Sequence, residues 1–344
     1  MHEKVLVTGG AGFIGHVFIK QLIENTEYEI ISIDRLDYSG NLNRISDMMQ
    51  NYDDTTKNRV KIIHHDLKAE INNLVQSQIG DVKHIFHIAA SSHVDRAIEN
   101  PMIFVQDNVV ATCNLLNYAR QIDNLETFVY FSTDEVFGPA LDGVKFKEWD
   151  RYNSTNPYSA SKAGGEELAI AFHNTYNVPV IITHCMNVFG ERQHPEKFIP
   201  NTVWKAINNE KIIIHADSTK SNPGSRHYVH VDDVADAVLF VINNKDKLKE
   251  IPDDQYGAKC KKINIASAFE LNNLEVAESI SKYLNLDIDY ELVDFHSTRP
   301  GHDLRYALDD TLIKSMGWES SKSTEKGLEQ VAKWYFENQE WLKF

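Results

Sequence analysis

The sequence predicts an α/β protein in which a doubly wound parallel sheet is joined to a smaller, interleaved α/β lobe in the C-terminal part of the chain. Strand-like and helical segments alternate over most of the 344 residues, which is typical of a parallel sheet covered by helices on both faces. A glycine-rich turn links the first predicted strand to the first helix, and the second strand ends in an acid. This combination indicates a Rossmann-type nucleotide-binding fold.

The glycine turn predicts a dinucleotide site. Residues 4–8 form a β-rich run without polar alternation, as in a strand buried on both faces, and Gly9, Gly12 and Gly15 follow it. Glycines there allow a tight turn and let a pyrophosphate approach the backbone N–H groups at the start of the helix. The second strand ends at Asp34, where a carboxylate can bind both ribose hydroxyls and would repel a 2′-phosphate. We therefore expect NAD rather than NADP.

Two further strand ends complete the expected cofactor site. Strand 60–64 leads to Asp66 and Leu67, whose carboxylate and backbone N–H can meet an adenine edge. Strand 84–88 leads to the small residues 89–91, over which the cofactor can pass. The polar stretch 47–58 shows no periodicity and predicts a surface loop. The expected cofactor contacts are Gly9, Gly12, Phe13, Ile14, Gly15, Asp34, Asp66, Leu67, Ala89, Ala90, Tyr158 and Lys162.

Candidate catalytic residues follow the next apolar strand. Thr133, Asp134 and Glu135 lie at its end, and Tyr158 and Lys162 come about one loop later, one helical turn apart. An ammonium beside a phenol favours the ionised phenol, so we expect a lowered pKa for Tyr158 and a role as base. Two adjacent carboxylates in a water-poor site should have their pKa values pushed apart, which provides one acid and one base. A lone Tyr-x-x-x-Lys pattern also occurs on exposed helical faces, but here it follows a cofactor turn.

Two predicted helices have apolar surfaces that are wider than packing against one face of a sheet requires. They cover residues 102–120 and 158–176. Two long helices of this kind can meet their symmetry mates, so we expect a homodimer held by a four-helix bundle.

The second half of the chain predicts a substrate lobe interleaved with the first domain. Residues 1–186, with 227–249 returning to them, are assigned to the NAD-binding domain, and residues 187–226 and 250–344 to a nucleotide-sugar-binding lobe. In this assignment a strand and a helix over 228–243 rejoin the main sheet. The lobe itself contains the loop 218–226, strands over 211–215, 262–265 and 288–293, a helix capped by Asn272 and Glu275, a basic turn over 299–303 and a terminal helix ending near residue 336.

Composition restricts the partners. The net charge of −15 argues against a nucleic-acid surface, and no stretch approaches the roughly twenty apolar residues of a membrane span. The first residues lead directly into a strand without a signal peptide, so we expect a cytoplasmic protein. Three widely spaced cysteines and fifteen histidines show no metal-ligand spacing, so no metal is expected.

Taken together, these motifs resemble those of the extended short-chain dehydrogenase/reductases and, within them, the dTDP-glucose 4,6-dehydratases. The resemblance covers nearly the whole chain and includes the glycine turn, the Thr-Asp-Glu strand end, Tyr158 to Lys162, and residues 194–200 and 299–303. The sequence departs from the usual bacterial pattern at Ser91, where Glu or Gln is common, at Phe137, where Tyr is usual, and in a longer 218–226 loop. The substrate contacts that the resemblance implies are Ser92, His93, Asn187, Glu196, Lys197, Arg226, Asn264, Arg299 and Asp303.

The resemblance also implies a reaction, the conversion of dTDP-glucose to its 4-keto-6-deoxy product. Tyr158, with Lys162 and Thr133, would take the C4 hydroxyl proton during oxidation, Glu135 the C5 proton, and Asp134 would protonate the leaving C6 hydroxyl. Hydride would return to C6, so NAD should stay bound. UDP-glucose is an open alternative substrate, since uridine and thymidine differ by one methyl. A nucleotide-sugar 4-epimerase or decarboxylase is a less favoured alternative, because neither reaction needs an acid and a base at C5 and C6. A cofactor-bound scaffold protein without turnover is least favoured, because it needs none of the five candidate catalytic residues.

Overall fold

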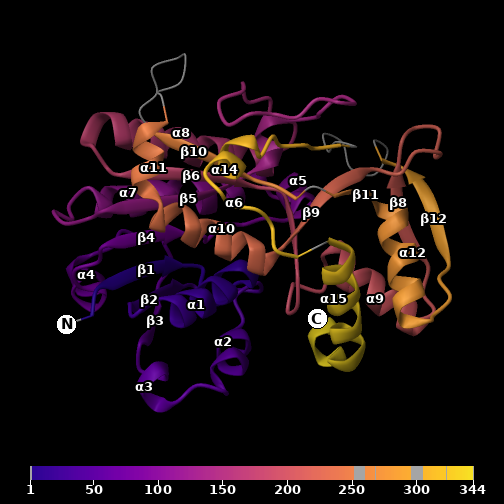
Figure 1. Ribbon diagram of the computed structural model, residues 1–344, viewed down its shortest axis with the longest axis horizontal. Coiled ribbons are helices and arrows are strands. Elements are labelled where there is room, and N and C mark those ends of the chain that lie inside the picture. Colours follow the sequence, from indigo (N-terminus) through magenta and orange to yellow (C-terminus); the bar gives the residue numbers. More distant parts are fainter. Residues whose placement is uncertain (1, 252–259, 268, 296–304, 323, 344) are drawn as a thin grey trace.

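A seven-stranded parallel sheet forms the centre of the larger part of the molecule (Figure 1). The computed structural model describes residues 2–251, 260–267, 269–295, 305–322 and 324–343. The strand order β10-β6-β5-β4-β1-β2-β3 reverses direction between β1 and β4, which creates a crevice at the carboxyl ends of these strands. The strands are β1 Lys4–Thr8, β2 Glu29–Asp34, β3 Val60–His64, β4 His84–His87, β5 Thr127–Thr133, β6 Val180–Cys185 and β10 Lys261–Ile265.

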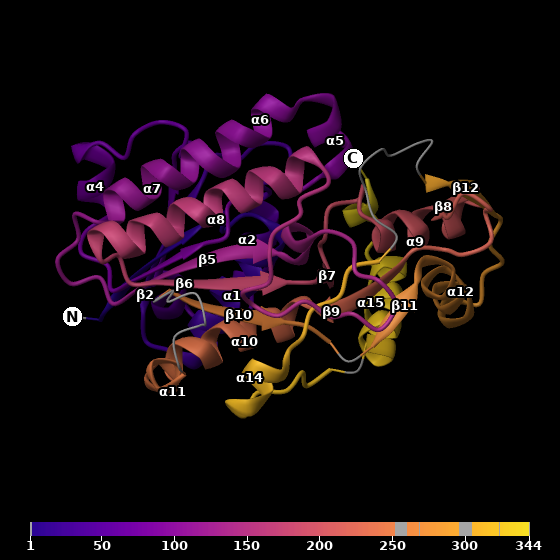
Figure 2. The ribbon, with the colours of Figure 1, turned by 90° about the horizontal axis from the view of Figure 1, so that it is seen from above.

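Helices cover both faces of this sheet, and Figure 2 shows the two layers on opposite sides of the strands. Helices α1 (Phe13–Asn25) and α10 (Val231–Asn243) pack against each other on one face, and their apolar residues share one core with β1 and β5. Helices α7 (Ala111–Ala119) and α8 (Pro157–Tyr176) contribute to a second core on the other face. Shorter helices connect the strands: α2 Leu42–Met49, α3 Asp54–Lys57, α4 Asn73–Ile79, α5 Val94–Glu99, α6 Pro101–Val105 and α11 Lys245–Glu250.

A smaller lobe lies beyond the carboxyl ends of the sheet, at the right of Figure 1. It contains the three-stranded sheet β11-β9-β7 and the parallel pair β12-β8. Its helices α9, α12 and α15 pack on one another around a separate apolar core that includes Val203, Ile280 and Tyr335. The elements are β7 Asn187–Phe189, α9 Phe198–Asn208, β8 Ile212–Ala216, β9 Ser225–His230, β11 Glu270–Asn272, α12 Asn273–Leu284, β12 Tyr290–Asp294, α15 Thr324–Glu337 and the 3-10 turn Gln339–Leu342.

The expected fold class is confirmed, and several local predictions are corrected. The stretch 47–58 is not a continuous loop, because α2 extends to Met49 and α3 adds one capped turn. Ile45 and Met49 lie four residues apart and form the buried face of α2. The polar residues around them obscure this helical periodicity in the sequence. Strand β9 begins at Ser225, so Arg226 belongs to a strand rather than to the 218–226 loop.

The path of the chain between the two parts also differs from the predicted division. Strand β9 pairs with β7 and β11 in the small sheet instead of returning to the main sheet, although α10 does return to pack on α1. Strand β10, assigned to the substrate lobe, pairs with β6 in the central sheet, and α14 (Thr311–Ser315) contacts it. Both strands are short and mix polar with apolar residues, so their pairing partners depend on tertiary packing.

The predicted helix over 102–120 is present with one irregularity. A π-helical segment, Gln106–Val110, separates α6 from α7 and buries Asp107 and Asn108. No helix in the described part of the chain is both long and apolar enough to cross a membrane. Within the same residues, no three or more His, Cys, Asp or Glu side chains form a group that could hold a metal ion.

Candidate active site

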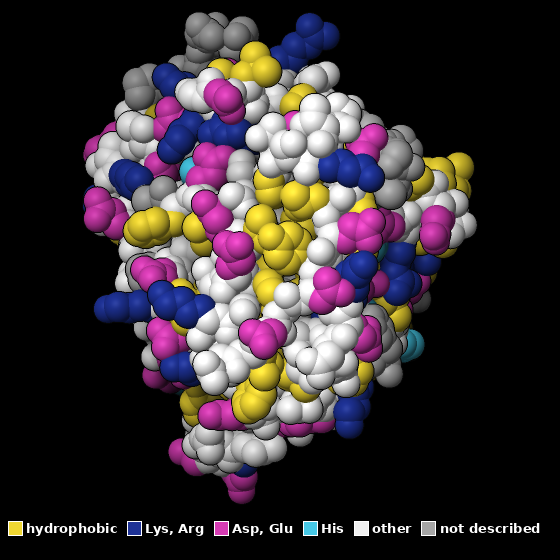
Figure 3. Space-filling model, turned by 90° about the vertical axis from the view of Figure 1, so that its right-hand side faces the viewer, with side chains coloured by type: hydrophobic (Ala, Val, Ile, Leu, Met, Phe, Trp, Pro, Cys, Tyr) yellow, Lys and Arg dark blue, Asp and Glu magenta, His cyan; other side chains and the backbone are white. Residues whose placement is uncertain are grey.

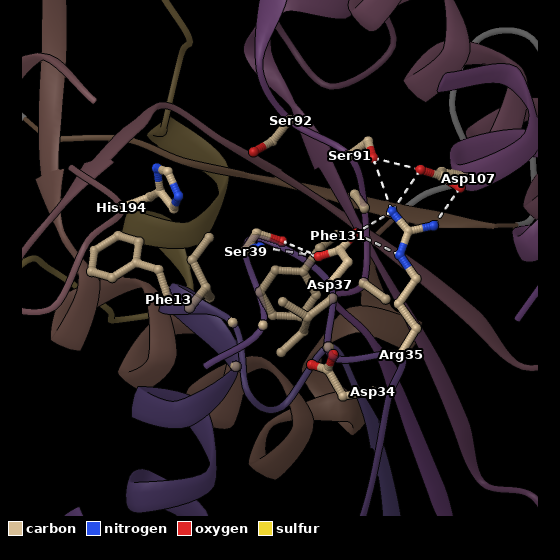
Figure 4. Close-up of a pocket in the computed structure, with 18 of the residues that line it drawn as sticks. Phe13, Asp34, Arg35, Asp37, Ser39, Ser91, Ser92, Asp107, Phe131 and His194 are labelled. Carbon is tan, nitrogen blue, oxygen red and sulfur yellow. Dashed lines mark hydrogen bonds and ion pairs between the residues drawn. The ribbon is translucent and has the colours of Figure 1, made fainter. Parts of the chain in front are cut away.

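The main cavity lies at the carboxyl ends of β1, β2 and β4, where the strand order reverses. Figure 4 shows residues from these strand ends and from the following loops around it. All ten cofactor contacts expected before Tyr158 line this cavity, as do Tyr158 and Lys162 themselves. The expected substrate contacts Ser92, Glu196 and Lys197 also line it.

The glycine turn leaves space that any side chain would fill. Gly9 has a φ of +73°, and a Cβ there would lie 2.8 Å from the Cα of Ala89. A Cβ on Gly15 would lie 2.1 Å from the carbonyl oxygen of Gly9. Helix α1 then begins at Phe13 with no side-chain cap on Gly12, so backbone N–H groups at its start remain for an anion. These observations fit a dinucleotide pyrophosphate at the turn.

Asp34 joins the glycine turn to the end of β2. One carboxylate oxygen accepts a hydrogen bond from the Ala11 N–H at 3.0 Å, and the other accepts from the Leu36 N–H at 2.8 Å. Arg44 supports the same turn by donating to the carbonyl oxygen of Ala11 at 2.9 Å. Because a carboxylate can accept more than one hydrogen bond per oxygen, Asp34 can still bind ribose hydroxyls.

The two adjacent carboxylates occupy unequal environments at the end of β5. A 3-10 turn, Asp134–Phe137, follows the strand, and the Thr133 hydroxyl accepts from the Glu135 N–H at its start. Asp134 is 2% exposed, and burial followed by repulsion from Glu135 raises its pKa from 3.8 to about 7. The Thr133 hydroxyl donates to one Asp134 oxygen at 3.0 Å, while Oδ2 is buried with no hydrogen-bond partner among the described residues. Glu135 is less buried and accepts from the Asn156 amide at 3.1 Å. The predicted division into one protonated and one ionisable group therefore has a physical basis.

Helix α8 brings Tyr158 and Lys162 to the same site. Asn156 caps the helix in a capping box with Ser159, and Pro157 occupies the first turn, so the helix begins just before Tyr158. Burial lowers the pKa of Lys162 to about 8, and its ammonium donates to the Phe131 carbonyl oxygen at 2.6 Å. The expected lowered pKa of Tyr158 is wrong. Burial, and then Glu135, raises the pKa of the phenol, while a hydrogen bond with Thr133 lowers it only in part.

A buried polar cluster lies behind these residues and was not predicted from the sequence. Glu166 accepts from the Ser132 hydroxyl at 2.6 Å and pairs with Lys262 at 3.0 Å and with His184 at 3.1 Å. Burial would raise the pKa of Glu166, but His184 and Lys262 outweigh it and hold this pKa well below its usual value. The expectation that Asn264 contacts substrate is corrected here. Its fully buried side chain bonds His184 at 3.0 Å and donates to the carbonyl oxygens of Phe146 and Asp309.

Charged groups from the loop after β4, from α5 and from the loop before α9 meet beside the cavity. The Lys197 ammonium donates to the Ser92 carbonyl oxygen at 3.1 Å, and Arg96 donates to Glu196 at 3.0 Å. His93 lies 4.0 Å from Glu196, at the start of α5. These contacts hold the loop after β4 against the loop before α9.

The remaining expected substrate residues lie on the small lobe or outside the described chain. Arg226 on β9 is 7% exposed, lies 4.7 Å over the ring of Tyr306, and is close enough to Asp134 to lower its pKa slightly. Asn187 lies on β7, paired in register with β9, and does not line the main cavity. Arg299 and Asp303 fall outside the described residues.

Several residues in the cavity wall were missed as site residues, and four of them interact with one another. Arg35, Asp37, Ser91 and Asp107 form one hydrogen-bonded group, drawn with dashed lines in Figure 4. The departure at Ser91 was a signal in the sequence, but its partner Asp107 lies 16 residues away within a predicted apolar helix.

The comparisons with known proteins agree with this geometry. Residues 6–331 match the family model described as GDP-mannose 4,6 dehydratase. The chain is 37% identical to the low-salt glycan biosynthesis protein Agl12 of Haloferax volcanii, over 98% of this chain and 99% of that protein. It is 34% identical to the dTDP-glucose 4,6-dehydratase of Escherichia coli, over 98% and 95% of the two chains. The crystal structure of the dTDP-glucose 4,6-dehydratase DesIV from Streptomyces venezuelae, with NAD and TYD bound, superposes with a TM-score of 0.84 at 32% identity over 99% of each chain. The chain therefore belongs to the GDP-mannose 4,6 dehydratase family of extended short-chain dehydrogenase/reductases.

Proposed function

We propose that this protein is an NAD-dependent hydro-lyase that converts dTDP-glucose to dTDP-4-keto-6-deoxyglucose. The observation that carries the proposal is the pair Asp134 and Glu135 at the end of β5, of which Asp134 has a pKa raised to about 7. A site with one protonated and one ionisable carboxyl can eliminate water across two neighbouring carbons. The dehydratase relatives support this assignment along nearly the whole chain.

When bound, the dinucleotide would supply the redox chemistry, as the acceptor of a hydride from C4 of the sugar and then as its donor to C6. The chain would hold it through the glycine turn at the pyrophosphate, Asp34 at the adenosine ribose, and Asp66 with Leu67 at the adenine. Because no net oxidation occurs, release of the cofactor is not required between turnovers.

The protein groups divide the proton transfers between two steps. Tyr158, beside Thr133 and Lys162, is placed to take the C4 hydroxyl proton during oxidation. This role needs the ionised phenol, so the positive charge of bound NAD would have to oppose the burial and the Glu135 repulsion that raise the pKa of Tyr158. The ketone that forms acidifies the C5 proton. Glu135 then removes the C5 proton, and protonated Asp134 donates to the C6 hydroxyl as it leaves. The high pKa of Asp134 keeps this proton available near neutral pH, where an ordinary aspartate would have lost it.

Substrate binding is proposed for residues on both sides of the cavity. Lys197 and Arg226 are cations suited to a diphosphate, and Ser92, His93 and Glu196 lie along the same wall. Asn187 on β7 is proposed as a further contact from the small lobe. We expect no nucleic-acid partner, and on the face shown in Figure 3 basic and acidic side chains are interspersed without a continuous basic surface.

Turnover of dTDP-glucose against UDP-glucose tests the proposal. The 4-keto-6-deoxy product should form from dTDP-glucose with the higher kcat/KM, and one thymine methyl in an apolar pocket accounts for roughly a 10- to 200-fold preference. Equal or better turnover of UDP-glucose would replace the nucleotide assignment and leave the chemistry intact. Inversion at C4 or loss of carbon dioxide from any nucleotide sugar, without dehydration, would replace the chemistry.

We also propose that two copies associate through α6, the π segment and α8. Large apolar side chains are at least 40% exposed on α6 and the π segment, namely Met102, Ile103, Val105 and Val110. On α8, Tyr176 is 47% exposed. Apolar side chains at this density on neighbouring helices are typical of a surface covered by another helix pair. Light scattering after gel filtration should give twice the 39.4 kDa chain mass, and Val110→Glu should shift it toward 39.4 kDa. A wild-type protein that elutes as a monomer would contradict the proposal.

A further inference from the structure

The group formed by Arg35, Asp37, Ser91 and Asp107 joins three separate segments across the cavity wall. Arg35 follows β2, Ser91 follows β4, and Asp107 lies in the π segment. The guanidinium donates to both oxygens of Asp107 at 2.6 and 2.8 Å and to Asp37 at 2.6 Å. The Ser91 hydroxyl donates to Asp107 at 2.6 Å. All four residues line the cavity that contains Asp34 and the glycine turn.

The π segment holds Asp107 firmly in this position. Its neighbour Asn108 accepts from the Ser91 N–H at 2.9 Å and donates to the Ser91 carbonyl oxygen at 3.0 Å. Asn108 also donates to the Ser161 hydroxyl on α8 at 2.9 Å. Two consecutive side chains of the segment therefore bind the same residue after β4, and Asp107 is fixed with its carboxylate toward Arg35.

Two cations and three carboxylates contact one another in this corner of the cavity, and Asp107 is shared by both cations. The second cation there, Lys68, lies 3.4 Å from Asp66 and 3.5 Å from Asp107. Burial would raise the pKa of Asp107, but hydrogen bonds from Arg35 and Ser91 outweigh it and lower this pKa, so the carboxylate is ionised. The hydrogen bond to Asp107 in turn raises the pKa of Arg35.

The position of Arg35 gives this arrangement a consequence for cofactor choice. An arginine close to the ribose-binding acid is the group that accommodates the 2′-phosphate in NADP-binding folds. Arg35 directly follows Asp34, but Figure 4 shows its guanidinium turned away from Asp34 toward Ser91 and Asp107. Its planar donors are occupied by two carboxylates, so they are withheld from a 2′-phosphate.

We infer that Asp107 is a positioning residue that, together with Asp37, fixes Arg35 in the adenosine wall of the cavity and thereby makes the chain select NAD over NADP. This inference rests on the dinucleotide site of the proposed function. It assigns part of the selectivity to a residue 73 positions away from Asp34 in the sequence, in addition to the repulsion that Asp34 itself exerts.

Competition between the two dinucleotides tests the inference without a catalytic readout. Purified protein is equilibrated with equal, saturating concentrations of NAD and NADP, freed of unbound dinucleotide and denatured, and the released NAD and NADP are quantified by chromatography. Asp107→Asn keeps the shape of the side chain and removes its charge, so the bound NAD to NADP ratio should fall roughly tenfold or more, as expected for a lost charged hydrogen-bond pair. Asp37→Asn should lower the ratio in the same direction.

The controls separate the role of Arg35 from a general change of charge or fold. Asp246→Asn alters the net charge equally at an exposed site and should leave the ratio unchanged. Adding Arg35→Gln to Asp107→Asn should abolish the gain in NADP, whereas a shift that persists would assign it to Lys68 and overturn the inference. Should Asp107→Asn fail to fold, Asp37→Asn decides the question, because its carboxylate is partly exposed.

Two outcomes overturn the inference in distinguishable ways. A ratio within twofold of wild type in folded Asp107→Asn, or in Asp37→Asn where Asp107→Asn does not fold, would refute the role of the cluster while leaving the dehydratase proposal in place. Wild-type protein that binds neither dinucleotide, or binds NADP in preference, would refute the assignment of NAD as cofactor, on which both this inference and the proposed function depend.

Discussion

Replacing Asp134 by asparagine should reduce activity. It should also remove part of the decrease in the free energy of unfolding that the wild type shows as pH rises. The wild-type carboxyl is buried beside Glu135, and its pKa is raised from 3.8 in the unfolded chain to about 7 in the folded protein. Between pH 6 and pH 8 the unfolded carboxyl is ionised throughout, whereas the folded one changes from mostly protonated to mostly ionised. The folded state therefore binds more protons in this range, and its stability decreases as pH rises.

The two pKa values set the size of the effect. A shift of about 3 units corresponds to roughly 4 kcal/mol in total, of which roughly 1.4 kcal/mol is lost between pH 6 and pH 8. Asparagine cannot ionise, so the variant should not undergo this part of the loss. Any fixed cost of a buried amide is the same at both pH values and cancels in the difference.

Urea denaturation of wild type and Asp134→Asn at pH 6 and pH 8, followed by tryptophan fluorescence with the dinucleotide at one fixed concentration, measures this difference. Relative to wild type, the variant should gain roughly 1.4 kcal/mol in free energy of unfolding on going from pH 6 to pH 8. Asp142→Asn, at an exposed aspartate, is the matched control and should show no such gain. An Asp134→Asn variant whose pH dependence equals that of wild type would refute the argument that this carboxyl is protonated near neutral pH.

Two further variants test the other groups of the site. Tyr158→Phe should lower kcat by roughly 10²- to 10⁴-fold and give no reduced-nicotinamide absorbance with the nucleotide sugar, because a phenyl ring cannot accept the C4 hydroxyl proton; an absorbance rise at the wild-type rate would contradict this role. Arg226→Lys should raise KM more than it lowers kcat, since an ammonium cannot make the bidentate contacts of a guanidinium, and an unchanged KM would remove Arg226 from the diphosphate site.

The predictions that held depend on short stretches of sequence. The glycine turn, Asp34 and the strand ends occupy their expected places because a turn conformation or the end of an apolar run determines each of them locally. Tyr158 and Lys162 share one side of α8 because their spacing is one helical turn.

The predictions that failed depend on contacts between distant segments. Asn264 was expected at the substrate, but pairing of β10 with β6 places it beside His184 inside the protein. The pKa of Tyr158 was expected to fall, but the depth of burial, which the sequence does not report, raises it. The pair of Arg35 and Asp107 spans 72 residues, and no local pattern indicates which acid meets which cation.

Single-turnover measurement on Glu135→Gln tests the 4,6-dehydratase assignment most directly. Glutamine cannot remove the C5 proton, whereas Tyr158, Lys162 and the dinucleotide site remain intact, so oxidation at C4 should still occur. Mixing the NAD-loaded variant with dTDP-glucose should produce reduced-nicotinamide absorbance that persists, with 4-keto-6-deoxy product formed roughly 10²- to 10⁴-fold more slowly than by wild type. Formation of that product at the wild-type rate would contradict the role of Glu135 and with it the proposed division of acid and base between Asp134 and Glu135.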